Sequence, residues 1–236
     1  MSKKQIKYLY KYKQIITAFD LTIVLDIINN RRIYLPRYEQ LNDPFESYMN
    51  DIYSAELGNS ILQNIGIRKE HINDRFNKYG ILSLTSNCRN QVMWTMYANY
   101  YKGICIGFEN LKDAKKIKYR KNYKERISKC VDDSNFTDKL IIDTLMVKYD
   151  TWKYEDEYRI ISKKKYLDIR KNIKFIILGQ ELDKELKQVL YNECKRNKID
   201  VYETFINYVQ NKIIIKKYGF KLEYNGSKIE DDLEKN

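Results

Sequence analysis

One continuous run, Met93–Glu109, constrains the fold more than any other part of this chain. It opens with Trp94 and Tyr97 at helical spacing, continues through a turn that ends in Gly103, and finishes in an apolar segment. Residues at this spacing share a helix face, and an apolar segment after a glycine turn is typical of a buried strand. We therefore expect a short aromatic helix, a tight turn and a central strand, with Trp94 and Cys105 in the core.

Similar patterns predict the remaining elements of the chain. Alternating or continuous apolar residues predict central strands at residues 6–12, 80–85, 104–109, 155–162 and 173–178. Other segments are expected to form strands at 32–35 and 200–206, helices at 15–30, 50–64, 67–78, 136–147 and 182–197, and a basic hairpin at 115–128.

The order of these elements indicates the fold class. Strands and helices mix irregularly and do not repeat as βαβ units, which favours an α+β fold with a mixed or antiparallel central sheet and flanking helices. Length and composition suit a single compact domain, which we expect to span residues 1–224. The polar segment 225–236 is expected to be a frayed C-terminal tail.

Histidine is scarce, and this excludes several classes of active site. The one histidine, His71, lies in a charged segment that is expected to be a solvated helix surface. Catalytic triads, Cys-His dyads and multi-histidine metal sites each need a suitably placed histidine. The four cysteines have no C-x-x-C spacing, so no zinc ribbon or redox motif is indicated. Chemistry is expected to depend on carboxylates, hydroxyls, Lys, Arg and aromatic side chains, with no metal.

The chain is basic, with 44 Lys and Arg against 32 Asp and Glu and a formal net charge of +12. A nucleic-acid partner is one explanation of such a balance. The codon bias of an AT-rich genome is another, because Lys, Asn, Ile and Tyr are all abundant and Lys is spread along the chain. Neither a membrane-spanning apolar run nor a signal-peptide core is present, so we expect a soluble cytoplasmic protein without a membrane partner.

The best candidate for a functional site is the segment Trp152–Ile161. If this segment is a strand, Glu155, Glu157 and Arg159 point to the same face of the sheet. Two neighbouring carboxylates repel each other unless a positive charge offsets them, and Arg159 can supply that charge. The pattern predicts either a structural ionic ladder or a carboxylate pair that lines a cleft, and both remain open.

Other candidate binding residues are polar or aromatic side chains on the first two central strands and on the aromatic helix: Lys11, Tyr12, Ser83, Thr85, Trp94 and Tyr97. The hydroxyls could orient a ribose or a carboxylate, and the aromatic rings could stack on a base or a nicotinamide. The alternatives are hydroxyls on a solvated sheet face and rings packed in the core. Asp43 precedes Pro44 and suits a helix N-cap, which already explains it structurally.

These segments resemble a family of bacterial and phage proteins catalogued as domain of unknown function 2971. The matching segments occur in the family's order and are Leu9–Tyr12, Leu41–Glu46, Gly80–Leu84, Met93–Glu109 and Trp152–Ile161. The resemblance implies a compact α+β domain that is often found among defence-related genes, and it implies no proven reaction. Lys13 and Tyr100 depart from the family, which often has Arg and His at these positions, so a histidine-dependent mechanism is not expected.

A second resemblance is to ADP-ribosyltransferases, which order a basic or His residue, a Ser-Thr-Ser-like strand and a Glu-x-Glu strand. Here the order is Lys11, then Ser83–Ser86, then Glu155–Glu157. Leu84 interrupts the hydroxyl motif, and Lys11 stands where Arg is usual. The resemblance implies NAD as the substrate, with a carboxylate placed where positive charge develops on the ribose.

Three functions therefore remain open. The first is an NAD-using transferase, such as a toxin or an antiphage effector, with an unidentified acceptor. In it, Glu157 is the catalytic carboxylate, Glu155 positions the acceptor, and Arg159 supports the pair. The second is a non-enzymatic nucleic-acid-binding or sensor module, which uses Lys and Tyr side chains. The third is a metal-dependent nuclease that combines both glutamates with Asp43.

Overall fold

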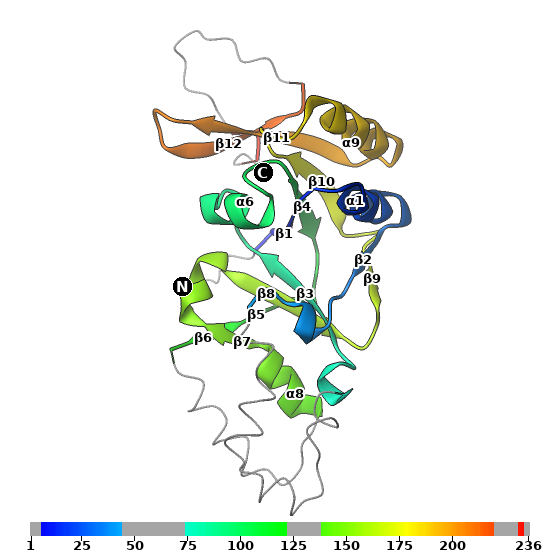
Figure 1. The fold of residues 1–236 in the computed structure, drawn as a ribbon, viewed down its shortest axis with the longest axis vertical. Coiled ribbons are helices and arrows are strands. Elements are labelled where there is room, and N and C mark those ends of the chain that lie inside the picture. The colour runs from blue at the N-terminus through cyan, green and yellow to red at the C-terminus, as the bar shows by residue number, and fades with distance from the viewer. Residues whose placement is uncertain (1–5, 44–73, 122–137, 220–230, 234–236) are drawn as a thin grey trace, which may run out of the picture. The chain divides into compact units, whose positions relative to one another are not determined.

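The computed structural model describes residues 6–43, 74–121, 138–219 and 231–233 (Figure 1). The chain divides into two compact units that interleave along the sequence. The first unit contains residues 1–33, 84–112 and 168–236, and the second contains residues 34–83 and 113–167. The expected boundary of a single domain at residue 224 stays a prediction.

The first unit contains a mixed sheet. Its strands are β1 (Tyr8–Lys13), β4 (Ile104–Glu109), β10 (Ile173–Leu178), β11 (Asp200–Asn207) and β12 (Lys212–Lys217). They are hydrogen-bonded in the order β12-β11-β10-β4-β1, and the end of β3 (Gly80–Thr85) follows β1 through the pair Tyr10–Thr85. Strands β10 and β11 are parallel, and the other pairs are antiparallel.

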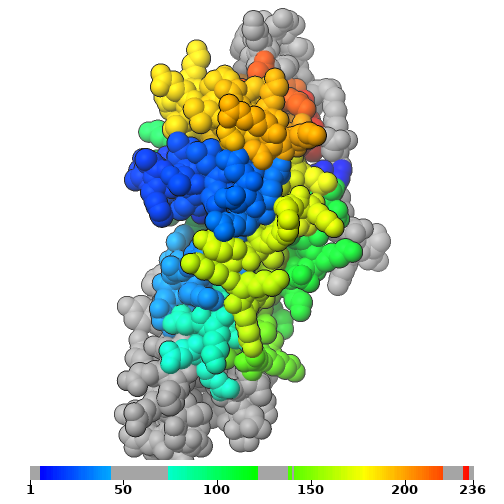
Figure 2. Space-filling model, turned by 90° about the vertical axis from the view of Figure 1, so that its right-hand side faces the viewer, coloured from blue at the N-terminus to red at the C-terminus, as the bar shows by residue number. Residues whose placement is uncertain are grey.

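Three helices accompany this sheet, and each begins at a capping side chain. Thr17 caps α1 (Ala18–Asn30), Asn90 caps α6 (Gln91–Tyr97), and Asp183 caps α9 (Lys184–Arg196) by accepting backbone N–H bonds. In Figure 1, α6 and α1 lie on opposite sides of strands β1 and β4. Figure 2 shows α1 and α9 side by side, and Asn197 after α9 donates a side-chain hydrogen bond of 2.8 Å to Asn29.

The core beneath α6 contains the aromatic residues that the sequence singled out. Trp94 and Cys105 are both fully buried, which confirms the expectation for this run. The Trp94 indole stacks on Tyr101 at 5.4 Å and meets Tyr12 edge-on at 5.1 Å. Its Nε1 donates a 2.8 Å hydrogen bond to the Cys88 carbonyl, so the polar atom of the ring is satisfied.

The turn after α6 has an unusual backbone. Asn99, Tyr100 and Tyr101 all have left-handed φ angles, of 45°, 53° and 64°. The following Gly103 is needed for a different reason: a Cβ there would lie 2.3 Å from the Lys13 carbonyl oxygen of β1. The predicted glycine turn therefore exists because two backbones pass very close together.

The second unit is built from shorter elements. Its strands are the start of β3, β5 (Lys115–Lys116), β6 (Lys118–Arg120), β7 (Val147–Tyr149) and β8 (Glu157–Ser162). Its helical segments are η1 (Tyr38–Gln40), α8 (Asp138–Leu145) and the 3-10 helix η2 (Asp150–Glu155). Strands β3, β8 and β5 are hydrogen-bonded in that order, and β6 pairs with β7 in parallel. The short strands β2 (Arg32–Tyr34) and β9 (Tyr166–Asp168) pair with each other.

The predicted α+β fold with a mixed sheet is confirmed. The hairpin predicted at 115–128 lies partly outside the described residues; within 115–120, β5 pairs with β8 and β6 pairs with β7. Two local expectations are wrong in part. The helix predicted at 136–147 ends at Leu145, because Val147 begins strand β7. The strand predicted at 155–162 begins at Glu157, because Glu155 ends η2 and Asp156 has a left-handed φ of 44°. Most of the helices expected at 50–64 and 67–78, with His71, lie outside the described residues.

Within the described ranges, no helix is long and apolar enough to cross a membrane.

Candidate functional site

A buried cluster of four charged side chains lies in the second unit. Glu157 is its centre: its Oε1 is 2.6 Å from Arg159 Nε, and its Oε2 is 3.2 Å from Lys148 Nζ. The Lys148 ammonium also lies 2.6 Å from Glu155 Oε2. None of the four residues is more than 5% exposed. The cluster therefore contains two carboxylates and two cations in mutual contact.

The backbone brings the two glutamates together in a way that strand alternation does not predict. Glu155 is the last residue of η2, and the left-handed Asp156 turns the chain into β8 at Glu157. Lys148, from the neighbouring strand β7, then bridges the two carboxylates. The expectation that Glu155, Glu157 and Arg159 share one strand face is wrong for Glu155, although the three charges do converge.

The surroundings of the cluster satisfy its polar atoms. Arg159 Nη1 donates a 2.6 Å hydrogen bond to the Leu145 carbonyl, and the Glu157 backbone N–H donates a 2.8 Å bond to the Tyr119 hydroxyl. The Lys148 ammonium lies 4.6 Å from the centre of the Trp152 ring, within cation–π range. Each charge in the cluster is thus paired or hydrogen-bonded, as burial requires.

The Glu157 carboxyl is kept ionised by its neighbours. Burial raises its pKa, but the positive charges of Arg159 and Lys148 lower it by more, and hydrogen bonds from Arg159 and the Ser83 hydroxyl add to this. The net result is a pKa well below the ordinary value of 4.5. At neutral pH this site therefore presents a carboxylate with fixed hydrogen-bond donors around it.

Ser83 and Glu157 were predicted as site residues from distant parts of the chain, and both lie in the second unit, on the adjacent strands β3 and β8. Thr85, the other hydroxyl of the motif, belongs to the first unit and is 1% exposed. Its Oγ1 accepts a hydrogen bond from the Asn87 backbone N–H. The alternative that Thr85 lies on a solvated sheet face is therefore wrong.

The other candidate binding residues lie in the first unit around Trp94. The hydroxyl of Tyr12 donates a 3.0 Å hydrogen bond to the Asn87 carbonyl, and Tyr97 packs against the buried cluster that contains Trp94. Lys11 lies on β1 opposite Ile106 of β4 and is partly exposed. Trp94 is fully buried in the described structure, so its environment is that of a core residue.

Asp43 is fully buried in the second unit. The helix that it was expected to cap would begin at Pro44, outside the described residues, so the capping role stays a prediction. Among the residues that the structure describes, no three His, Cys, Asp or Glu side chains are grouped to hold a metal ion. The structure therefore adds no support to the nuclease alternative.

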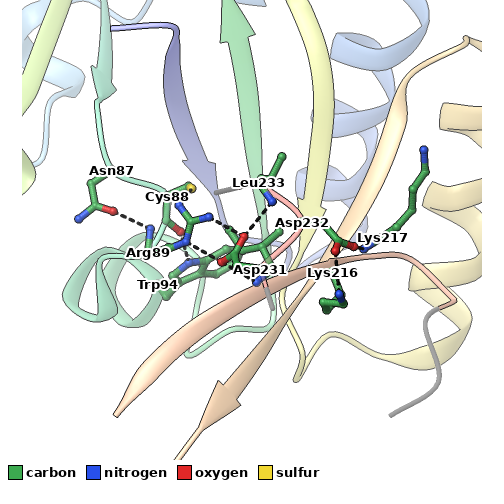
Figure 3. Close-up of polar contacts among 10 residues, drawn as sticks. Asn87, Cys88, Arg89, Trp94, Lys216, Lys217, Asp231, Asp232 and Leu233 are labelled. Carbon is green, nitrogen blue, oxygen red and sulfur yellow. Dashed lines mark hydrogen bonds and ion pairs between the residues drawn. The ribbon is translucent and has the colours of Figure 1, made fainter. Parts of the chain in front are cut away.

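Sequence analysis missed two ionic contacts. One is the contact of Lys148 with the two glutamates. It depends on the pairing of β7 with β6, and no local sequence pattern indicates it. The other joins Arg89 to Asp231 in the first unit (Figure 3). Arg89 Nε and Nη2 donate to the two carboxylate oxygens of Asp231 at 2.8 and 2.7 Å.

The Asp231 carboxylate is also tied to the sheet. It accepts a 3.1 Å hydrogen bond from the Ile215 backbone N–H and a 2.8 Å bond from the Leu233 N–H. The next residue, Asp232, accepts from the Lys216 ammonium at 2.7 Å and from the Lys217 backbone N–H at 2.9 Å (Figure 3). The expectation of a frayed tail is therefore wrong for residues 231–233, because charged groups far away in sequence bind them.

Replacing Asp231 by Asn is expected to lower the free energy of unfolding by about 1.5–3 kcal/mol, because a largely buried guanidinium loses its charged partner. Urea unfolding followed by tryptophan fluorescence measures this change. The matched control is Asp200→Asn, whose ion pair with Lys217 is more than half exposed and should contribute less than about 1 kcal/mol. Equal losses in both variants would contradict a special role for the Asp231 contact.

Comparison with known proteins gives one match. Residues 93–160 match a family described as a protein of unknown function (DUF2971). The matched segment includes most of α6, all of β4 and the four charged residues of the buried cluster. Neither the curated proteins nor the solved structures include a match to this chain. The match supports the expected family and assigns no reaction.

Proposed function

We propose that this chain, whose residues 93–160 match a family of unknown function, is a transferase that uses NAD and that Glu157 is its catalytic carboxylate. The observation that carries the proposal is that strand β3, which bears Ser83, lies next to strand β8, which begins at the buried carboxylate of Glu157. A hydroxyl-bearing strand and a glutamate strand are the two elements that an ADP-ribosyltransferase combines in one site.

The chemistry follows from an ionised carboxylate. In the transfer, the bond between the ribose C1′ and the nicotinamide nitrogen breaks, and neutral nicotinamide leaves with the electron pair. The acceptor, or water, forms a new bond to C1′ and releases a proton. Positive charge develops on the ribose meanwhile, and a fixed carboxylate stabilises it. The low pKa of Glu157 keeps this negative charge present at neutral pH.

The proposal requires one neighbour of Glu157 to move, because the side chain is 2% exposed. Lys148 is the weaker of its two ionic partners, since its Nζ lies 3.2 Å from Glu157 Oε2 whereas Arg159 Nε lies 2.6 Å from Oε1. A flexible lysine side chain can also turn away more easily than an arginine that is hydrogen-bonded to a backbone carbonyl. We assign Lys148 as the group that substrate displaces, and Glu155 as the carboxylate that then faces the acceptor.

The test is release of nicotinamide from labelled NAD by the purified protein, with bacterial protein, RNA or water as the acceptor. Wild type is expected to release nicotinamide, and Glu157→Gln is expected to lose about 10²–10³ of the rate per folded molecule. Asp156→Asn is the matched control, because Asp156 pairs with the half-exposed Lys116 and leaves the cluster intact. The same order of activities is expected for growth inhibition or phage protection in cells.

Two results would contradict the transferase. One is the absence of nicotinamide release by wild type with all three kinds of acceptor. The other is a Glu157→Gln protein that, measured per folded molecule, matches wild type; the four charges would then be a structural network only. Ser83→Ala tests whether the hydroxyl positions the Glu157 carboxylate or binds the substrate. A positioning role predicts a lower kcat with an unchanged KM.

A further inference from the structure

Several exposed apolar and aromatic side chains of the first unit lie on α6, on the turn after it and on the β11–β12 hairpin. The most exposed are at the hairpin tip, where Tyr208 is 81% and Val209 is 93% exposed. We call the following set the α6–hairpin surface: Val92, Met96, Tyr100, Tyr101, Tyr208 and Val209. Isolated exposed apolar residues are ordinary, but several on adjacent segments mark a binding surface.

Packing on a shared buried cluster places these segments together. Tyr97 and Tyr101 pack against the same buried cluster as Ile213 of β12. Figures 1 and 3 both show the hairpin beside α6.

The left-handed turn fixes which rings face outward. Tyr101 stacks on the buried Trp94 with an interplanar angle of 5°, whereas its neighbour Tyr100 is 67% exposed. Left-handed backbone is unfavourable for a residue such as tyrosine and usually persists where a function uses it. The turn packs tightly against the backbone of Gly179, since a Cβ at this position would lie 2.0 Å from the Tyr101 carbonyl oxygen. The left-handed backbone of the turn therefore holds the Tyr100 side chain at the surface of the unit.

The charge of the surface indicates its partner. Residues 91–102 and 204–215 contain no Asp or Glu, and their only charged residues are Lys102 and Lys212. Both lysines are exposed. Side-chain amides accompany them at Asn99, Asn207, Gln210 and Asn211. Aromatic rings that stack on bases, together with ammonium groups that contact phosphates, are the means by which proteins bind single strands.

We propose that the α6–hairpin surface binds single-stranded nucleic acid. Tyr100 and Tyr208 stack on bases, and Lys102 and Lys212 contact phosphates. The site lies wholly in the first unit, whereas the Glu157 cluster lies in the second, so this inference is independent of the transferase proposal.

The binding test compares oligonucleotides that carry the same charge. Fluorescence anisotropy is measured with a labelled oligo(U), with oligo(dT), and with an abasic oligodeoxynucleotide of equal length. Stacking predicts saturable binding to the base-containing strands and at least about tenfold weaker binding to the abasic strand. The RNA and DNA arms show which sugar is preferred. Equal affinity for the abasic strand would overturn the proposal, since the net charge of +12 would then explain the binding by itself.

The tyrosine variants and their control keep the net charge constant. Tyr208→Ala and Tyr100→Asn are each expected to weaken binding at least about fivefold; Asn is chosen at position 100 because it tolerates left-handed backbone. Phe19→Ala is the control, because Phe19 on α1 is 72% exposed and lies outside the surface. Lys212→Gln should reduce the slope of log affinity against log salt by about 0.7.

Three outcomes would overturn the proposal: no binding by wild type, equal weakening in the Phe19→Ala control, or unchanged binding in both tyrosine variants. A wild-type dimer that dissociates on Tyr208→Ala, with oligonucleotide binding retained, would assign the surface to a second copy of the chain. Circular dichroism of each variant confirms the fold before binding is compared.

Discussion

Replacing Glu157 by Gln is expected to lower the free energy of unfolding by about 3–5 kcal/mol, which is among the largest effects of any single change in this chain. The carboxylate is the common partner of Arg159 and Lys148, both of them buried. Glutamine preserves the shape and removes the charge, so the two cations and Glu155 are left with an unbalanced positive charge. Urea unfolding at neutral pH measures the loss.

The same group makes stability depend on pH. The folded pKa of Glu157 lies below its unfolded value of about 4.5, so its contribution is fully present above that pH and is lost as the pH falls through the folded pKa. Wild type is therefore expected to lose stability below about pH 4.5, and Glu157→Gln should show a flatter profile. Asp156→Asn is the control: its ion pair is exposed and should contribute less than about 1 kcal/mol. Equal profiles for wild type and Glu157→Gln would show that the carboxyl is not ionised by its neighbours.

Replacing Trp94 by Ala is expected to cost about 3–5 kcal/mol, because a fully buried indole is removed from between Tyr12 and Tyr101 and leaves a cavity. The Cys88 carbonyl also loses its hydrogen bond from the indole N–H. Thermal unfolding by circular dichroism is a suitable measurement, since the variant loses a fluorophore. Phe19→Ala, which removes an exposed ring, should stay within about 0.5 kcal/mol of wild type.

Two further results would show whether the Trp94 ring is packed in the core. Trp94→Phe should lie between wild type and Trp94→Ala, because it retains a ring in the cavity but not the hydrogen bond. A Trp94→Ala protein as stable as wild type would mean that the ring is free to serve as a stacking surface, as the first interpretation of the motif allowed.

Local sequence patterns predicted most of the strands of the first unit and the helices that accompany them, but not β12. The strands β3 and β4 begin and end where the apolar pattern does, and the helix expected at 182–197 forms as α9 behind its Asp183 cap. These elements follow from nearest neighbours in the chain: side-chain alternation, apolar spacing and capping residues act over a few positions. The family resemblance has the same local basis, since its matched segment is one continuous stretch.

The tertiary structure alone decided which charges meet. The spacing of Glu155 and Glu157 predicted that they would share a strand face. Instead, the left-handed Asp156 separates them, and Lys148 from strand β7 contacts both carboxylates. The contact of Arg89 with Asp231 likewise depends on where distant segments pack. A charged side chain on its own carries no information about its partner, because any opposite charge that the fold brings within reach can neutralise it. Many elements of the first unit could therefore be predicted from the sequence, whereas the chemistry of the Glu157 site depends on contacts that only the folded chain makes.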